Sequence, residues 1–367
     1  MRVCLDIQSA IAQRAGVGRY TKMLVEHLAA TRLPADELSL FYFDFQRRGI
    51  PFPVPRATQR ACRWLPGRYV QKAWKTVGWP PFDLLAGSAD VFHFPNFIRP
   101  PLTHGKTVVT IHDVSFLRMP ETTEEKNLRY LTGCIRDTVA RADAIIADSE
   151  FTRREIIGLL NVPPDRVTTI LLGIEPPRDA AISNLKSQIS NSAPFLFTVG
   201  TLEPRKNYPF LIDVFDRLDR FDGDLVIAGG RGWKFEPILE RIARSPKRDR
   251  IRVLDYVTED ELDRLYREAA LFVFPSRYEG FGFPPLEAMA RGTPVVSAAT
   301  ASLPEVLGNA ARLITNFDAE NWAAQIASLL ENETARRELA VRGPAQAAKF
   351  TWDETARQTW KIYRSLA

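Results

Sequence analysis

The 367-residue chain is poor in cysteine and histidine and contains no long apolar run. Its three cysteines, Cys4, Cys62 and Cys134, are odd in number and far apart, which argues against a disulfide framework or a structural zinc site. With four histidines and no creditable Asp-x-Asp motif, neither a metal nor another cofactor is expected. The sequence has no apolar run of about 18 residues, the length that a membrane-spanning helix needs, and no signal peptide is recognised before the first strand-like run. A cytoplasmic protein without a membrane span is therefore expected.

Acidic residues are missing between Phe45 and Phe82, although the net charge of the chain is only +5. This window holds basic and aromatic side chains instead: Arg47, Arg48, Arg56, Arg60, Arg63, Trp64, Arg68, Tyr69, Lys72, Trp74, Lys75 and Trp79. From Arg68 to Val77, the apolar residues fall on one face of a predicted helix. They could dock the chain on an anionic membrane through Arg68, Lys72, Trp74 and Lys75, or simply face the core. No nucleic-acid motif accompanies the patch, so nucleic acid is not an expected partner.

Short β-rich runs alternate with helical patterns along the chain, which predicts an α/β fold with two Rossmann-like, parallel-sheet domains. The runs are VCLDI, LSLFYF, VFHF, TVVTI, AIIA and VTTIL in the first half, and FLFTV, DLVIA, IRVL, LFVF and PVVS in the second. Helices are expected at Thr123–Arg141 and Tyr208–Leu218. A polar stretch bracketed by prolines predicts a linker at 176–193, between an N-terminal domain at 1–175 and a C-terminal domain at 194–351.

Ligands of open parallel sheets bind beyond the carboxyl ends of the strands, so the residues that follow each strand are the candidate site. Gly16 and Gly18 follow the first run and precede a helix, where they could admit a ligand or merely form a tight turn. His112 and Asp113 follow TVVTI. This pair could contact a ligand, or the acid could orient the imidazole; a plain structural role is the alternative.

The loop GTLEPRKN follows FLFTV and carries two adjacent cations before a helix. The dipole at a helix N-terminus prefers anions, so Arg205 and Lys206 need negative charge nearby. A diphosphate would supply it, with Gly200 opening the loop. The alternative is a pair of solvated surface cations.

The stretch YEGFGFPPLEAMARGTPVV places two glutamates around an apolar turn. A helix is predicted to begin at Pro285 and end at Arg291, which puts Glu287 near the third helical position. A capping box is then excluded, because Pro284 as the capping residue has no amide hydrogen. Glu287 is therefore expected to be free to bind a vicinal diol and Glu279 a second polyol. The backbone amides between them are candidate phosphate ligands: Phe281, Gly282 and Phe283.

Together, these motifs resemble the retaining GT-B glycosyltransferases of family 4. The resemblance covers nearly the whole chain: GVGRY, TIHDVSFLRMPE, IIADSEFTRREI, VGTLEPRKN, the two-glutamate stretch and FTWDETARQTWKIY. It implies two Rossmann-like domains facing across a cleft, a nucleotide-sugar donor held mainly by the C-terminal domain, and a last helix within 352–367 that crosses back onto the N-terminal domain.

The resemblance also implies roles for individual residues. Glu287 would bind the ribose, Glu279 the transferred sugar, and His112 would lie near the anomeric carbon, with Asp113 a candidate sugar or acceptor contact. Arg205 and Lys206 would neutralise the diphosphate in place of a metal. Further donor contacts are implied at the glycine loops and the apolar turn: Gly16, Gly18, Gly200, Thr201, Phe281, Gly282 and Phe283. One departure concerns Thr201, since many relatives have an arginine there, and Arg205 would then supply the missing charge.

TIHDVSFLRMPE and GTLEPRKN look most like bacterial mannosyltransferases of polysaccharide and O-antigen assembly. The expected donor is therefore GDP-mannose, and the expected acceptor a glycan or lipid-linked glycan at the inner face of the cell membrane. Three alternatives remain open: a UDP-hexose-dependent transferase, a sugar phosphorylase on the same fold, and a non-catalytic binding subunit.

Overall fold

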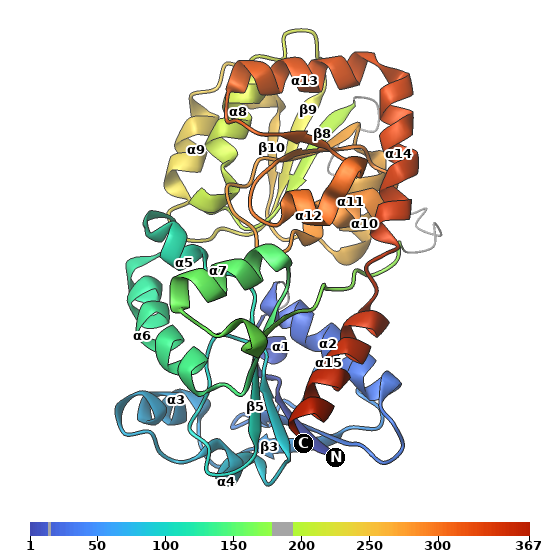
Figure 1. Cartoon of the computed structure of the whole chain (residues 1–367). Helices are drawn as coiled ribbons and strands as arrows, with labels where there is room; N and C mark the ends of the chain where they lie inside the picture. The colour runs from blue at the N-terminus through green and yellow to red at the C-terminus, as the bar shows by residue number, and fades with distance from the viewer. Residues whose placement is uncertain (14–15, 178–193) are drawn as a thin grey trace. The chain divides into compact units, whose positions relative to one another are not determined.

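The computed structural model describes residues 1–13, 16–177 and 194–367 (Figure 1). Most of the predicted linker at 176–193 therefore lies outside the described residues, as do positions 14–15 of the first glycine loop. The chain divides into two compact units. The N-terminal unit comprises Met1–Leu117, Lys126–Gly173 and Thr351–Ala367, and the C-terminal unit comprises Arg118–Glu125 and Ile174–Phe350.

The N-terminal unit is built on a seven-stranded parallel sheet with the order β3-β2-β1-β4-β5-β6-β7. Its central strands are continuous apolar runs because helices cover both of their faces. The strands are β1 (Arg2–Asp6), β2 (Glu37–Phe43), β3 (Thr58–Cys62), β4 (Val91–Phe94), β5 (Lys106–Ile111), β6 (Ala144–Ala147) and β7 (Val167–Thr169). Edge strand β3 was not predicted, since its sequence TQRAC is polar and mostly exposed.

The helices of the first half of the chain connect these strands. They are α1 (Gln8–Ala12), α2 (Val17–Thr31), α3 (Gly67–Thr76), α4 (Phe82–Ala86), α5 (Ser115–Arg118), α6 (Glu125–Arg141) and α7 (Glu150–Leu160), with 3-10 turns η1 (Pro120–Thr122) and η2 (Pro164–Arg166). The helix predicted from Thr123 thus begins two residues later, at Glu125. Ser149 caps α7, accepting a hydrogen bond from the Thr152 amide.

The C-terminal unit contains a six-stranded parallel sheet with the order β10-β9-β8-β11-β12-β13. The strands are β8 (Phe195–Val199), β9 (Asp224–Ala228), β10 (Ile251–Leu254), β11 (Leu271–Phe274), β12 (Val295–Ala298) and β13 (Arg312–Ile314). Short edge strand β13 was not predicted. The two parallel sheets confirm the predicted α/β fold class.

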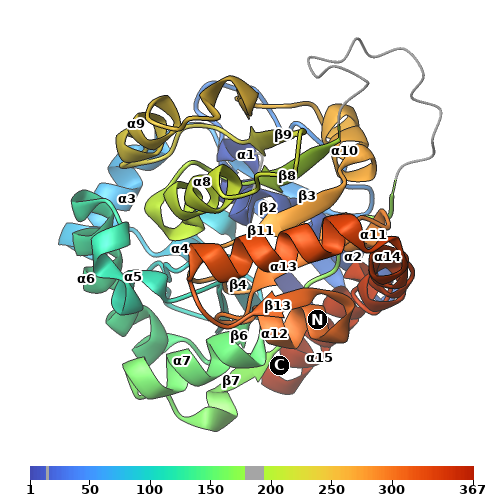
Figure 2. The same cartoon turned by 90° about the horizontal axis from the view of Figure 1, so that it is seen from above.

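Helices cover both faces of this second sheet (Figure 2). The helices are α8 (Tyr208–Asp216), α9 (Glu236–Ala243), α10 (Glu259–Glu268), α11 (Phe283–Ala290), α12 (Leu303–Leu307), α13 (Ala319–Glu331) and α14 (Glu333–Ala347), with 3-10 turns η3 (Pro204–Lys206), η4 (Arg248–Arg250) and η5 (Gly308–Ala310). Residues of α8, α9 and α13 share one core with the strands, including the buried Trp322. On the other face, Tyr266 of α10 packs against Phe197 and Phe272.

The last helix, α15 (Trp352–Leu366), belongs to the N-terminal unit, as expected. Its Trp360 indole donates to the Leu28 carbonyl of α2 (3.2 Å), and its Tyr363 hydroxyl hydrogen-bonds with His93 of β4 (2.6 Å). Gly173 permits this crossing, because a β-carbon there would come within 2.1 Å of the Trp352 amide nitrogen. The structure thus confirms that the C-terminal helix returns to the N-terminal unit.

Within the described ranges, no helix combines the length and the apolar character that crossing a bilayer requires.

Candidate functional site

A compact ion cluster forms where the loop after β8 meets the loop after β11. Lys206 Nζ lies 2.6 Å from Glu279 Oε1, and Arg205 Nη1 lies 3.0 Å from Glu279 Oε2. Arg205 Nη2 also lies 2.7 Å from Glu203 Oε1. We call these four residues the cation cluster. Glu203, Lys206 and Glu279 are buried, so their charges interact in a medium of low polarity.

The cation cluster corrects one expectation from the sequence. Arg205 and Lys206 were expected to need a diphosphate or another source of negative charge, and the structure shows that Glu203 and Glu279 of the chain itself already neutralise them. Burial alone would raise the pKa of Glu279, but Lys206 and Arg205 lower it to about 2. The Glu279 carboxylate is therefore ionised at neutral pH, and it can accept hydrogen bonds but cannot act as a general acid.

Backbone contacts fix the two loops to each other. Arg205 donates a second hydrogen bond to the Tyr278 carbonyl (2.7 Å), and the Arg277 amide donates to the Arg205 carbonyl (2.9 Å). Ser302 donates to the carbonyls of Glu279 and Phe281 (2.8 and 2.9 Å). At the base of the cation loop, Gly200 has a φ of 152°, and a β-carbon there would lie 3.3 Å from Lys206 Cε. These contacts preorganise the cluster.

The helix after the apolar turn begins earlier than the sequence predicted. α11 runs from Phe283 to Ala290 with Gly282 at the N-cap, not from Pro285 with Pro284 at the N-cap. Gly282 can precede the helix because its φ is 108°, a conformation that side chains with a β-carbon rarely adopt. Glu287 consequently lies at the fifth helical position, so the capping argument made for it was wrong.

Glu287 is also not free, as the sequence had suggested. Its Oε2 accepts a hydrogen bond from the Tyr266 hydroxyl (2.9 Å), and both side chains are buried. The hydroxyl holds the carboxylate in one orientation. A ligand diol would have to share this carboxylate with Tyr266 rather than meet a solvated side chain.

The apolar turn itself is packed rather than open. The Phe281 ring is buried and lies edge-on to the rings of Phe283 (5.3 Å) and Phe350 (5.7 Å). A β-carbon on Gly282 would come within 2.7 Å of Leu303. The turn brings the backbone of Phe281, Gly282 and Phe283 to the start of α11, where a helix N-terminus favours anions.

In the N-terminal unit, His112 follows β5 and pairs with Asp148, which follows β6. The Nδ1 atom lies 2.6 Å from Asp148 Oδ2, and Nε2 lies 3.0 Å from the Pro95 carbonyl oxygen. Both partners are acceptors, so both bonds form only when the imidazole is protonated. Burial would lower the pKa of His112, but the Asp148 carboxylate outweighs it and holds the pKa above its usual value. The Tyr20 ring packs edge-on at 4.6 Å.

The acid that orients His112 is therefore Asp148, and Asp113 is not that acid. Asp113 Oδ1 instead accepts hydrogen bonds from the amide and hydroxyl of Ser115, the first residue of α5. Sequence reasoning missed Asp148, although it follows the strand AIIA, in the same kind of position as His112. Parallel strands β5 and β6 are neighbours, which places their following residues side by side.

The first glycine pair has a backbone role in the structure. Gly16 is the exposed N-cap of α2, with a φ of 58°. A β-carbon on Gly18 would lie 2.0 Å from the Gln13 carbonyl oxygen, so close packing of α1 against α2 already requires this glycine. In the second unit, Thr201 is exposed beside the cation cluster.

The predicted basic helix is present as α3, but its apolar residues divide between two environments. Val70 is buried, and Trp74 packs against Phe43 and Phe82 while its indole donates to the Pro80 carbonyl (2.6 Å). Trp74 is therefore largely a core residue, which contradicts its assignment as a membrane contact. Arg68, Lys72 and Lys75 are exposed, as are four nearby aromatic side chains: Phe45, Trp64, Tyr69 and Trp79.

Among the described residues, no group of three or more His, Cys, Asp and Glu side chains could hold a metal ion. Cys4, Cys62 and Cys134 are all free thiols.

Comparison with known proteins matches both halves of the chain to family models. The model described as Glycosyltransferase Family 4 matches residues 14–178, and that described as Glycosyl transferases group 1 matches residues 182–346. O-antigen chain mannosyltransferase B of Escherichia coli is 31% identical over 96% of this chain and 96% of its own. The serotype-specific mannosyltransferase WbdA of Escherichia coli is 32% identical over 68% of this chain but only 32% of its own length.

A solved structure with the same architecture is that of sucrose-phosphate synthase from Thermosynechococcus elongatus. It aligns with a TM-score of 0.77 over 100% of this chain and 98% of its own, at 18% identity. At that identity, the likeness supports the fold alone.

Proposed function

Since the chain belongs to glycosyltransferase family 4, group 1, with a GT-B fold, we propose that it transfers mannose from GDP-mannose to a glycan. The family makes it a hexosyltransferase, and its mannosyltransferase relatives support a role in the synthesis of cell-surface polysaccharide such as O-antigen. The proposal adds the donor, retention of anomeric configuration, and independence from metal ions. The expected acceptor is a glycan or lipid-linked glycan.

The cation cluster is the observation that carries this proposal. Arg205 and Lys206 stand at the carboxyl end of β8, preceding α8, and their counter-ions are carboxylates of the chain. An incoming diphosphate can replace Glu279 as the partner of Lys206. The carboxylate released from Lys206 stays paired with Arg205 and therefore stays ionised, and it can accept hydrogen bonds from the sugar hydroxyls.

The cluster also suits the chemistry of the transfer step. The bond between the anomeric carbon and the diphosphate oxygen breaks, and the electron pair leaves with the diphosphate. Fixed cations stabilise this growing negative charge more in the transition state than in the ground state, as a metal ion would elsewhere. The acceptor hydroxyl bonds to the anomeric carbon on the same face, and its proton passes to the departing phosphate oxygen.

Glu279 is assigned to binding and orientation rather than to nucleophilic attack. Retaining glycosidases use a carboxylate nucleophile about 5 Å from a second carboxyl acid. Here the Glu279 carboxylate keeps its ion pair with Arg205 at 3.0 Å after the exchange, which lowers its nucleophilicity. Glu287, held by Tyr266, is assigned to the ribose hydroxyls of the donor.

A donor screen tests the function directly. Purified protein is incubated with GDP-mannose, UDP-hexoses or ADP-glucose, with a mannan oligosaccharide as acceptor, in the presence of EDTA. We expect GDP release from GDP-mannose alone, unaffected by EDTA, and an α-linked product by NMR. Turnover of UDP-hexoses only would refute GDP-mannose as the donor. A β-linked product would refute retention of the anomeric configuration. Phosphate-dependent release of sugar phosphate would indicate a phosphorylase.

A charge-matched pair of variants tests the cation cluster. Lys206→Gln should lower kcat by roughly 100- to 1,000-fold, the usual effect of removing one preorganised donor from a developing anion. Lys349→Gln, an exposed lysine on the same unit, is the control. Equal activity of the two variants would remove Lys206 from the mechanism.

We further propose that the exposed basic and aromatic surface around α3 docks the protein on an anionic membrane, where a lipid-linked acceptor resides. Acidic residues are absent from 45–82, and Trp64 and Trp79 are 66% and 64% exposed. Wild-type protein should float with phosphatidylglycerol vesicles, and the double variant Trp64→Ser/Trp79→Ser should no longer float with them. The docking would be refuted if the wild type did not float with the vesicles, or if the double variant floated as well as the wild type.

A further inference from the structure

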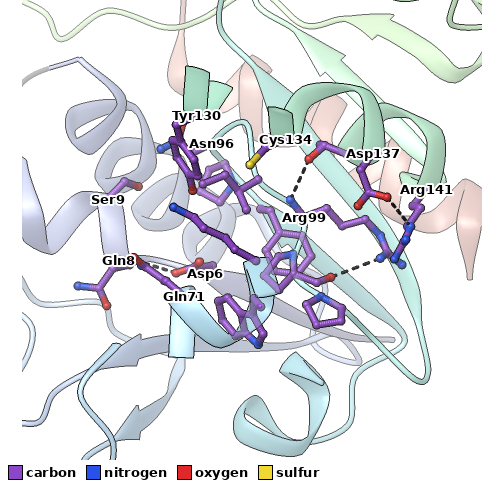
Figure 3. Close-up of a pocket in the computed structure, with 18 of the residues that line it drawn as sticks. Asp6, Gln8, Ser9, Gln71, Asn96, Arg99, Tyr130, Cys134, Asp137 and Arg141 are labelled. Carbon is purple, nitrogen blue, oxygen red and sulfur yellow. Dashed lines mark hydrogen bonds and ion pairs between the residues drawn. The ribbon is translucent and has the colours of Figure 1, made fainter. Parts of the chain in front are cut away.

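The cavity of the N-terminal unit, about 560 Å³ in volume, is walled by α1, α3 and α6 (Figure 3). It lies at the carboxyl ends of β1 and β4, the edge at which ligands of parallel sheets bind, so it belongs with the proposed reaction. The C-terminal unit contains another feature, to which that reaction assigns no role so far. This feature is a buried polar contact between α10 and α11.

Two side chains of α10 meet two side chains of α11 in this contact. Arg291 Nε lies 2.7 Å from Asp263 Oδ1, and the Tyr266 hydroxyl donates to Glu287 Oε2 at 2.9 Å. The two α10 residues are three positions apart and the two residues from α11 and its C-cap are four apart, so each pair lies on one face of its helix. We call these four residues the α10–α11 quartet.

Arg291 joins the two pairs into one network. Its guanidinium carbon lies 5.3 Å from the centre of the Tyr266 ring, and its Nη1 donates to the Glu287 carbonyl at 3.0 Å. That carbonyl is one of the last four of α11, which have no amide partner within the helix. Arg291 therefore holds the main chain of Glu287, while Tyr266 holds its carboxylate.

Tyr266 is itself fixed by the residues around it. Its ring packs edge-on against Phe197 (5.3 Å) and at a tilt against Phe272 (5.4 Å). Its carbonyl accepts a hydrogen bond from the Thr293 hydroxyl at 2.5 Å. The ring cannot turn without breaking these contacts, so the hydroxyl donates to Glu287 from one fixed position.

Helix packing alone does not explain a polar network at this contact. Asp263, Tyr266 and Glu287 are buried, and the Arg291 side chain is 9% exposed. Buried ion pairs are often no more stabilising than apolar side chains of the same size, because the charges lose their hydration. What a hydrogen bond adds is direction, since it fixes where an oxygen atom points. The oxygen atoms fixed in this way are those of Glu287.

We propose that Tyr266 and Arg291 are positioning residues, which hold Glu287 in the orientation that a vicinal diol needs and so make the donor site select ribonucleotides over 2′-deoxyribonucleotides. A carboxylate offers about four acceptor positions, so one phenol hydroxyl does not exhaust them. A carboxylate that is already oriented loses less conformational freedom when it binds the diol. The inference rests on the proposed function, which places the ribose at Glu287.

The selectivity for ribose measures this positioning directly. In the wild type, GDP should bind roughly 10- to 100-fold more tightly than 2′-deoxy-GDP, the effect of one hydrogen bond to a charged group. Tyr266→Phe should reduce this ratio of Kd values to less than about 3-fold, because nothing then holds the carboxylate towards the diol. Calorimetric titration with both nucleotides gives the ratio. A merely structural defect would weaken both nucleotides alike and leave the ratio unchanged.

Two further variants complete the test. Arg291→Lys should also lower the ratio, because an ammonium group lacks the planar fork that reaches Asp263 and the Glu287 carbonyl together. Tyr42→Phe is the matched control, since it removes a phenol hydrogen bond to Gln59 (3.1 Å) in the N-terminal unit, and it should keep the wild-type ratio. The proposal is overturned if Tyr266→Phe or Arg291→Lys discriminates between the two nucleotides as sharply as the wild type.

The same titrations with UDP and 2′-deoxy-UDP separate this inference from the proposed donor. If only the uridine nucleotides bind, and Tyr266→Phe lowers their ratio, GDP-mannose is refuted as the donor and the positioning role stands. If GDP binds but the wild type accepts 2′-deoxy-GDP equally well, the positioning role is refuted, whereas transfer from GDP-mannose is still decided by the donor screen.

Discussion

At the scale of single residues, Glu279 has two roles that exclude each other. In the structure, it pairs with Lys206 and Arg205, and in the proposed donor complex it binds sugar hydroxyls. Its removal should therefore leave the buried Lys206 ready for a diphosphate, while Arg205 keeps its ion pair with Glu203. The same carboxylate that orients the sugar thus also limits how tightly the free enzyme binds nucleotide.

Glu279→Gln should accordingly bind GDP as tightly as wild type or tighter, while kcat falls by roughly 100-fold or more because the sugar is misoriented. Glu287→Ala should instead weaken GDP binding itself. Calorimetric titration with GDP and steady-state kinetics measure the two effects. Equal loss of GDP affinity and turnover in Glu279→Gln would refute its role in orienting the sugar.

Glu279 should also make the free energy of unfolding dependent on pH in the acidic range. Its pKa is about 2 in the folded protein against an ordinary 4.5, so the carboxylate stabilises the fold above pH 4.5 and this contribution disappears as the pH falls towards 2. At about 1.4 kcal/mol per pKa unit, the contribution is on the order of 3 kcal/mol. The difference in the free energy of unfolding between wild type and Glu279→Gln, from urea titration, should shrink over this interval. A difference that is constant with pH would contradict it.

At the scale of elements, the sequence predicted well those segments whose pattern is set by burial. The apolar runs VFHF and LFVF became β4 and β11, and α15 has the predicted bounds. Edge strands β3 and β13 were not predicted, because their composition is not typical of strands and only their pairing with β2 and β12 identifies them. The start of α11 was predicted wrongly, because the positive φ of Gly282, and not the prolines that follow it, sets the first residue of the helix.

The sequence singled out the charges of the candidate site, but it did not give the residues that pair with them. Lys206 and Glu279 are 73 residues apart and meet only because β8 and β11 are neighbours. Strand order is a tertiary property, and the sequence pattern does not contain it. The same reason explains why Asp148 was missed as the partner of His112.

A buried hydrogen-bond chain joins helix α15 to the neighbourhood of His112. Tyr363 bonds with His93, His93 Nε2 with Thr110 (2.8 Å), and Thr110 with the hydroxyl of Tyr20 (3.0 Å), whose ring packs on His112. Burial lowers the pKa of His93 to about 3, so this imidazole stays neutral.

Tyr363→Phe should leave His93 Nδ1 without its partner, although Nε2 keeps Thr110, and destabilise the protein by about 1–3 kcal/mol, the usual cost of an unsatisfied buried polar group. Lys361→Met, an exposed position on the same helix, is the control. Urea unfolding measures both. A Tyr363→Phe protein as stable as wild type would show that the chain of bonds is not needed for the fold.

At the scale of the whole molecule, the donor-binding candidates fall mostly in one unit. Glu279, Glu287, Arg205 and Lys206 all belong to the C-terminal unit. Nucleotide alone should therefore stabilise that unit by up to about 2.7 kcal/mol at a hundredfold excess over Kd.

Hydrogen exchange with and without GDP should show this selectivity. Protection is expected in peptides covering 199–207 and 276–291, and little in the sheet of the N-terminal unit. UDP at the same concentration serves as the control for the base. Protection confined to the N-terminal unit would contradict the assignment of the donor site.

The return of α15 to the N-terminal unit has a consequence for synthesis on the ribosome. Residues 174–350 form a continuous stretch that can fold as soon as it emerges. The N-terminal unit emerges first, yet His93 and Leu28 must wait for Tyr363 and Trp360, hundreds of residues later. The half of the protein that is made first is thus completed last, because a nascent chain that stalls before Thr351 still lacks Tyr363 and Trp360 as partners for His93 and Leu28.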